Sequence, residues 1–125
     1  METYNIEINK KYEVTSQDID DIMATALDSI RYWCRKAKVV GEYLGEYASD
    51  QISRGGSLIL YDAESNDCWE LNLENLLHGI EKAIEDNWFD DYGWYDNGVL
   101  YTTEIDGEVA DVIVQLALFD DIVFG

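Results

Sequence analysis

Apolar residues recur three and four positions apart along residues 19–34, and this spacing constrains the fold more than any other feature of the sequence. Such a stripe predicts an amphipathic helix of about 20 residues with one buried face. Thr15, followed three residues later by Asp18, resembles a capping box and predicts where the helix begins. The stripe consists of Ile19, Ile22, Met23, Ala26, Leu27, Ile30 and Cys34. The cations expected at the carboxyl end, where the helix dipole favours them, are Arg31, Arg35, Lys36 and Lys38.

Two more helices are predicted in the second half of the chain. Asn72 is suited to cap a helix over Leu73–Asn87, which carries its own apolar stripe. Asp106 lies near the start of a third helix over Glu108–Phe119. That segment is rich in Val and Ile, so a strand competes, but its apolar residues recur at helical spacing and favour the helix.

Short strands are expected between the helices. Residues 3–8 alternate weakly, and residues 38–43 form a second candidate strand. Residues 45–54 predict a short helix that stops at Gly55-Gly56.

Two hairpins are predicted from turn chemistry. Ser57–Tyr61 and Cys68–Leu73 are separated by a turn-compatible acidic segment. Asn97-Gly98 is a strong type I′ turn signal and joins residues 94–96 to 99–103. Three helices packed on a small antiparallel sheet make an α+β fold, and 125 residues suit a single domain over 1–125.

The charge balance excludes several classes of partner. Eight Lys and Arg stand against 27 Asp and Glu, a net charge of −19, while 47% apolar residues allow a folded core. Few phosphates could be neutralised, so direct nucleic-acid binding and docking on anionic membranes are not expected. Basic proteins, metal ions and sites that normally hold nucleic acid are the expected partners. The oligomeric state is left open.

The cysteines and the apolar runs indicate a cytoplasmic protein. Cys34 and Cys68 lie far apart and outside any CxxC pair, so reduced thiols are favoured over a single disulfide. No apolar run has the length of a signal peptide or a membrane span.

Neither catalysis nor a cofactor is predicted. His78 is the only histidine, and no identifiable nucleophile or metal partner accompanies it. The sequence contains no P-loop, GxGxxG, GxSxG or HExxH motif, although the abundant carboxylates leave a glycosidase-like acid pair open.

One acidic segment resembles a calcium loop in composition but not in pattern. Counted from Asp62, the sixth and twelfth positions of an EF-hand fall on Asp67 and Leu73, where glycine and an acid are required. A solvated hairpin turn is therefore favoured, and no metal site is predicted. The oxygen-bearing residues of this segment are Asp62, Glu64, Asn66 and Asp67.

The acid is concentrated in the last third of the chain. Residues 83–125 carry eleven Asp and Glu and no Lys or Arg, interleaved with aromatic residues. Such a face can imitate a phosphate backbone and anchor a basic partner through its aromatics. The alternative is a surface kept for solubility, with the aromatics in the core. The candidate partner-binding residues are Trp88, Asp90, Asp91, Tyr92, Trp94, Tyr95, Asp96, Glu104, Asp106, Glu108 and Asp111.

Several stretches carry a resemblance that spans most of the chain. They are residues 12–15, 18–22, 43–56, 61–64, 113–115 and 124–125. Together they resemble a group of small uncharacterised acidic proteins from Firmicutes phages and mobile elements. The chain is also similar in type to anti-CRISPR and other anti-defence proteins. The resemblance implies no catalytic motif.

These observations favour a non-catalytic protein that occludes a basic, nucleic-acid-handling partner by nucleic-acid mimicry. The alternative is a structural module of a mobile element that self-associates or binds Ca²⁺ or Mg²⁺ through its acids.

Overall fold

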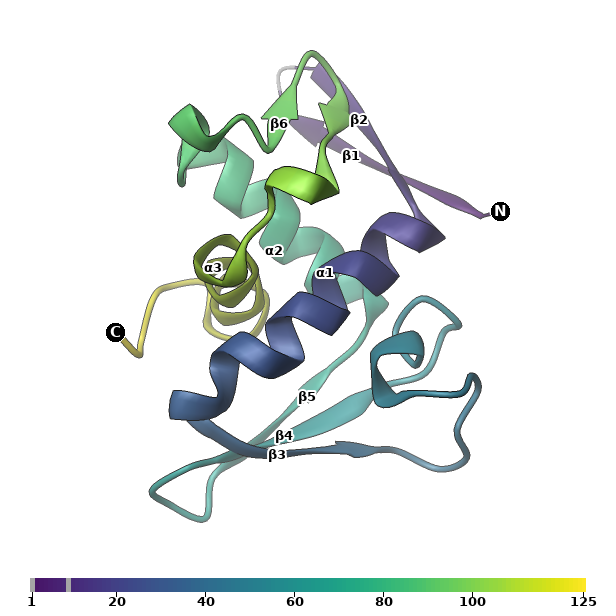
Figure 1. The fold of residues 1–125 in the computed structure, drawn as a ribbon, viewed down its shortest axis with the longest axis vertical. Coiled ribbons are helices and arrows are strands. Elements are labelled where there is room, and N and C mark those ends of the chain that lie inside the picture. Colours follow the sequence, from purple (N-terminus) through teal and green to yellow (C-terminus); the bar gives the residue numbers. More distant parts are fainter. Residues whose placement is uncertain (1, 9) are drawn as a thin grey trace.

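Three helices occupy the middle of the molecule, with small antiparallel sheets at both ends (Figure 1). The structure is a computed structural model that describes residues 2–8 and 10–125. The predicted α+β class is confirmed, but the strands form three separate sheets where one was expected. The elements are β1 (Thr3–Ile8), β2 (Lys10–Thr15), α1 (Ser16–Ser29), β3 (Cys34–Val39), β4 (Leu58–Asp62), β5 (Cys68–Leu71), α2 (Leu73–Glu85), β6 (Tyr95–Asp96), β7 (Val99–Leu100) and α3 (Gly107–Phe119).

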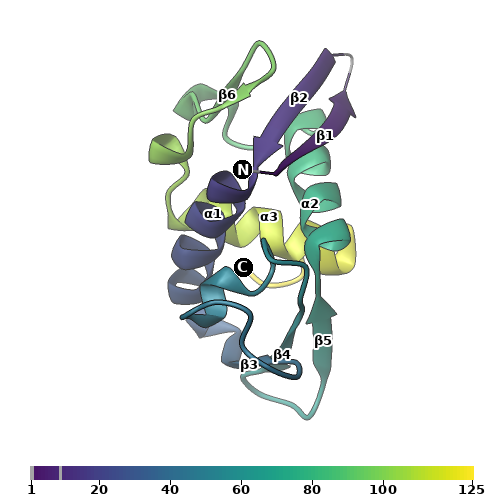
Figure 2. The same ribbon diagram turned by 90° about the vertical axis from the view of Figure 1, so that its right-hand side faces the viewer.

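The sheets differ in size and position. β1–β2 and β6–β7 are two-stranded hairpins near one end of the long axis, and β3–β4–β5 forms the other end (Figure 1, Figure 2). The backbone N–H of Glu13 on β2 donates to the carbonyl of Gly98 at 3.4 Å, which ties the two hairpins together.

α3 is the most buried element. From Val109 to Ala117 every residue except Asp111 is buried. Both α1 and α2 pack on this helix. α2 comes closest at Gly79, where a Cβ would overlap the Ile113 carbonyl and lie 2.9 Å from the Ala117 Cβ. The backbones of α2 and α3 therefore meet at a position that only glycine can fill.

The start of α1 is as predicted, but its end is not. Thr15 Oγ1 accepts from the Asp18 N–H at 3.1 Å, and Asp18 accepts from the Thr15 N–H at 3.0 Å, which completes the capping box. The helix ends at Ser29, and the chain passes through a 3₁₀ turn (Ile30–Tyr32) into β3. Ile30 and Cys34 are both buried, so the apolar pattern of the sequence runs on to Cys34. The backbone between these two residues nevertheless leaves the helix and turns.

This correction moves the basic cluster. Arg31 lies in the 3₁₀ turn, while Arg35, Lys36 and Lys38 lie on β3. They do not cluster in the last turn of α1, which contains no basic residue. Arg35, Lys36 and Lys38 line a strand at the edge of its sheet, where lysines protect against unwanted pairing.

The strand predictions are partly confirmed. β1 and the β4–β5 hairpin form as expected, with Leu58 opposite Leu71 and Leu60 opposite Trp69. β2 was not predicted. β3 ends at Val39, so the strand expected over 38–43 is largely wrong.

The short helix expected over residues 45–54 is also wrong. Only Ala48–Asp50 forms a 3₁₀ turn there. In the loop before this turn, backbone groups form hydrogen bonds with the Gln51 side chain. These bonds compete with the backbone hydrogen bonds that a longer helix would need.

α2 has clear signals at both ends. Asn72 caps it by accepting from the Asn75 N–H at 2.9 Å. At its end Asn87 adopts a left-handed φ of 59° and donates to the Ile84 carbonyl at 3.1 Å, while the Trp88 N–H donates to the Ala83 carbonyl at 2.9 Å. This is a Schellman motif, and it sets the direction of the chain that follows.

The C-terminal tail is held by a buried glutamine. Gln115 is 1% exposed, and its Oε1 accepts from the N–H groups of Val123 and Phe124 at 2.9 and 2.8 Å. The Phe124 ring stacks on Trp33 with a centroid separation of 4.9 Å. Among the residues that the structure describes, no helix has the length and apolarity needed to cross a membrane.

Gly79→Ala tests the contact between α2 and α3. We expect it to lower the free energy of unfolding by about 1–3 kcal/mol, because overpacking forces the two backbones apart. Urea unfolding followed by circular dichroism measures the change. Glu85→Ala, an exposed site on the same helix, should stay within about 0.5 kcal/mol of the wild type. Equal effects of the two substitutions would contradict the close approach.

Candidate partner-binding surface

The chain after α2 folds back in a short loop that is anchored by a tryptophan. A 3₁₀ turn over Asp90–Tyr92 lies between Phe89 and Gly93, whose φ angles of 52° and 74° are left-handed. Trp94 is 0% exposed, and its Nε1 donates to the Trp88 carbonyl at 2.8 Å. The prediction that Trp94 contacts a partner is therefore wrong. Its large apolar ring belongs to the core, and its N–H finds a partner inside the loop.

The other aromatic residues of the loop are half-buried. Trp88 and Phe89 have ring centroids 5.9 Å apart, and Phe89 and Tyr92 have centroids 4.8 Å apart. Tyr95 packs edge-on against Tyr12 of β2 at 6.3 Å. These rings cover the core with one side and remain partly open to solvent with the other.

Acids from two elements act by their charge on Tyr92. Asp91 comes from the 3₁₀ turn, while Asp106 and Glu108 come from the start of α3, and all three are exposed. Asp106 caps α3 by accepting from the Val109 N–H at 3.0 Å. Partial burial raises the pKa of Tyr92, and the neighbouring charges of Glu108, Asp106 and Asp91 raise it further. We call these four residues the Tyr92 cluster.

Asp90, Asp96 and Glu104 are also exposed. Burial raises the pKa of Tyr95, and the charge of Asp90 adds to the effect. Asp96 precedes the turn of that hairpin, whose Asn97 and Gly98 have φ angles of 47° and 84°, as a type I′ turn requires. Glu104 ends the 3₁₀ turn Thr102–Glu104.

Asp111 is not part of this surface. Its carboxylate accepts from Trp33 Nε1 at 2.9 Å and from Gln115 Nε2 at 3.0 Å, and it also accepts from the Tyr32 hydroxyl. Asp111 is half-buried, and these bonds give it a structural role that the prediction of partner binding did not include. Asp111 fastens α3 to the turn that follows α1.

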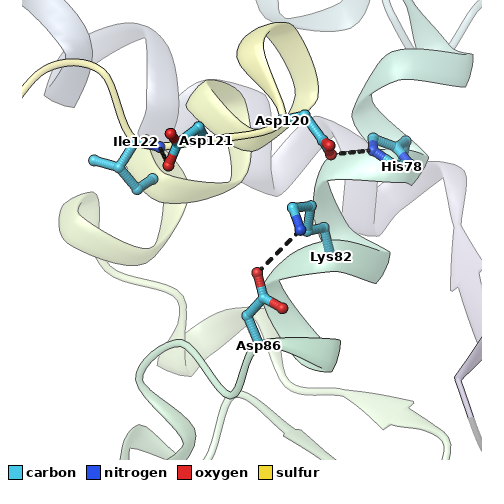
Figure 3. Close-up of polar contacts among 6 residues, drawn as sticks. All are labelled: His78, Lys82, Asp86, Asp120, Asp121 and Ile122. Atoms are coloured by element: carbon cyan, nitrogen blue, oxygen red, sulfur yellow. Dashed lines mark hydrogen bonds and ion pairs between the residues drawn. The ribbon is translucent and has the colours of Figure 1, made fainter.

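Two ion pairs offset acids that lie near α2. His78 Nε2 lies 2.8 Å from the Asp120 carboxylate, and Lys82 Nζ lies 3.3 Å from that of Asp86 (Figure 3). The hydrogen bond from His78 lowers the pKa of Asp120, and the charge of Lys82 contributes as well. The single histidine thus has a partner on the surface. Neither of these two ion pairs includes an acid of the Tyr92 cluster.

The acidic segment that resembles a calcium loop has a role in local structure. Asp62 accepts from the Glu64 N–H and the Ser65 hydroxyl, both at 2.9 Å, so its carboxylate shapes the β4–β5 turn. Within residues 2–8 and 10–125, no three His, Cys, Asp or Glu side chains are placed to hold a metal ion. Cys34 is buried, Cys68 is exposed, and both are free thiols.

No family model, curated protein or solved structure matches the chain. The resemblance to phage and mobile-element proteins therefore stays a prediction. The geometry of the surface carries the functional argument.

A second exposed group, not singled out from the sequence, lies in residues 40–47. It contains Tyr43 and Tyr47, each 61% exposed. The signal that could have found it is the repeated Glu-Tyr pair at 42–43 and 46–47.

Asp111→Asn tests the role given to that carboxylate. Burial, together with the hydrogen bond and charge of Asp111, raises the pKa of Tyr32 from 10.0 to about 12. The folded state therefore favours the neutral phenol, and its stabilising contribution is complete below pH 10.0 and is lost as the pH rises toward about 12. The substitution should lower the pKa of Tyr32, read from its ring carbons by NMR. Asp96→Asn removes the same charge elsewhere and should leave that pKa unchanged. A Tyr32 pKa that is the same in Asp111→Asn and in the wild type would refute the role given to Asp111.

Proposed function

We propose that this protein binds a basic, nucleic-acid-handling protein and occludes its nucleic-acid site without performing chemistry. The observation that carries the proposal is the Tyr92 cluster, where three exposed carboxylates from two elements exert their charge on one half-buried tyrosine. Asp106 is held by its hydrogen bond at the start of α3, Glu108 lies in the first turn of that helix, and Asp91 lies in a short 3₁₀ turn. Fixed carboxylates at a protein surface can take the place of backbone phosphates in a cationic groove.

The charge of the whole chain supports the same reading. A net charge of −19 steers a cationic partner toward the protein and accelerates association, more strongly at low salt. The half-buried rings of Trp88, Phe89 and Tyr95 lie beside the acids and supply contact area of the type found at binding hot spots. The charge of the whole chain thus supplies steering, and the aromatic residues of one segment supply anchoring.

The proposed mechanism is steric and electrostatic. The acidic surface fills the groove of a cytoplasmic nuclease or DNA-binding protein, and bound nucleic acid and this protein exclude each other. The resemblance to phage and mobile-element proteins agrees with an anti-defence role of this kind.

Neutralising the Tyr92 cluster tests the proposal. The variant Asp91→Asn, Asp106→Asn, Glu108→Gln removes three charges, while asparagine still caps α3. A basic partner is first isolated with the wild-type protein from a bacterial extract and purified. Its Kd for the cluster variant should rise about tenfold or more, and rising salt should weaken wild-type binding.

The matched control removes three exposed acids from the β4–β5 hairpin, Glu64→Gln, Asp67→Asn and Glu70→Gln. It should change the Kd by less than about threefold. Equal loss in both triple variants, binding that is indifferent to salt, or simultaneous binding of nucleic acid and this protein would each contradict the proposal.

A further inference from the structure

Residues Val40–Tyr47 form an exposed loop at the opposite end of the molecule from the β6–β7 hairpin (Figure 1). The loop connects β3 to the 3₁₀ turn at Ala48–Asp50. Four large apolar or aromatic side chains stand in solvent within this one short segment, a density that marks interaction sites. They are Val40 at 44%, Tyr43 at 61%, Leu44 at 47% and Tyr47 at 61% exposed.

The loop is held rigid by a buried amide. Gln51 is 1% exposed, its Oε1 accepts from the Leu44 N–H at 3.0 Å, and its Nε2 donates to the Glu42 carbonyl at 3.1 Å. A Cβ on Gly56 would lie 2.8 Å from the Gln51 Cδ, so the glycine makes room for this amide. The Asp50 carboxylate also accepts from the Tyr47 N–H at 3.1 Å.

Burying an amide group is unfavourable unless its hydrogen bonds are made, and the bonds of Gln51 to the loop meet this requirement. Here those bonds fix a backbone that turns its apolar side chains outward, away from the core. A loop fixed in this way loses little conformational entropy when it binds a partner. Rigid support for exposed aromatic residues is expected of a docking loop.

The side chains of the loop indicate what it would bind. Glu42 precedes Tyr43 and Glu46 precedes Tyr47 in the sequence, and all four residues are exposed. Residues 39–53 contain no Lys or Arg, and the cation nearest in sequence, Arg54, lies beside Gly45. A carboxylate beside an aromatic ring attracts a lysine or arginine side chain by charge and by cation–π contact.

The same chemistry occurs within the protein. The guanidinium of Arg35 lies 5.2 Å from the centre of the Tyr61 ring, and the ammonium of Lys36 lies 5.9 Å from it. Arg35 Nε also donates to the carbonyl of Asp62, the residue after Tyr61, at 3.1 Å. The Tyr61 ring on β4 therefore already receives two cations from β3.

We infer that residues 40–47, the Glu–Tyr loop, form a second docking site that takes arginine and lysine side chains of a basic protein partner. Beside Tyr47 a hollow of about 360 Å³ opens against α1; it is lined by Ala24, Leu27 and Ala48, with Asp28 and Arg31 also at its walls. It offers room for the apolar stem of such a side chain. A nucleic acid or a second copy of this chain would be repelled by the net charge of −19.

The inference rests on the proposed function only in that the partner is basic. The two sites lie at different ends of the molecule, so each can fail alone. An NMR titration of ¹⁵N-labelled protein with an oligoarginine peptide, followed amide by amide, separates them.

If the Glu–Tyr loop binds the peptide, the amide signals of residues 42–47 should shift when the peptide is added. Tyr43→Leu with Tyr47→Leu keeps the charge and the apolar character but removes both rings. It should weaken peptide binding at the loop by about fivefold to thirtyfold. Tyr101→Leu, at a tyrosine that is 45% exposed, is the matched control and should leave the affinity unchanged.

Shifts confined to the Tyr92 cluster, or equal weakening by Tyr101→Leu, would overturn the loop site and leave the proposed function standing. Loop shifts with an unchanged partner affinity in the Tyr92 cluster variant would support the loop and refute the proposed function.

Discussion

The close approach of α2 and α3 at Gly79 is the contact on which the rest of the structure depends. α2 lies directly against the α3 backbone there, and the Schellman motif at Asn87 then turns the chain into the loop anchored by Trp94. That loop carries Asp91, while Asp106 and Glu108 lie at the start of α3. The candidate surface therefore follows from helix packing, although none of its acids takes part in that packing.

α3 also organises the other side of the molecule. Asp111 and Gln115 lie one turn apart on the helix, and together they bond Tyr32, Trp33 and the C-terminal tail. Gln51 plays a comparable part for the Glu–Tyr loop. Buried amides and one partly buried carboxylate thus fix irregular segments that have no regular hydrogen bonding of their own.

Local signals predicted the parts of the fold that are decided locally. Thr15 with Asp18, Asn72 and Asp106 each cap the helix that the sequence assigned to them, and Asn97-Gly98 forms the expected turn. The end of α1 was missed because an apolar period cannot distinguish a continuing helix from a turn that keeps Cys34 buried.

The candidate site was predicted only in part, because local signals do not show which side chains contact distant parts of the fold. The segment and its exposed acids could be read from charge and composition. The burial of Trp94 depends on tertiary packing, and the hydrogen bonds of Asp111 depend on Tyr32 and Trp33, which are distant in sequence. The Glu–Tyr loop was missed because its rigidity comes from the Gln51 side chain, whose burial has no local sequence signal.

Hydrogen exchange of the protein, alone and bound to its purified basic partner, tests the central claim most directly. Binding through the Tyr92 cluster predicts slower amide exchange in residues 89–96 and 104–108 of the complex. Unchanged exchange in both segments, with protection confined to other parts of the chain, would contradict the account.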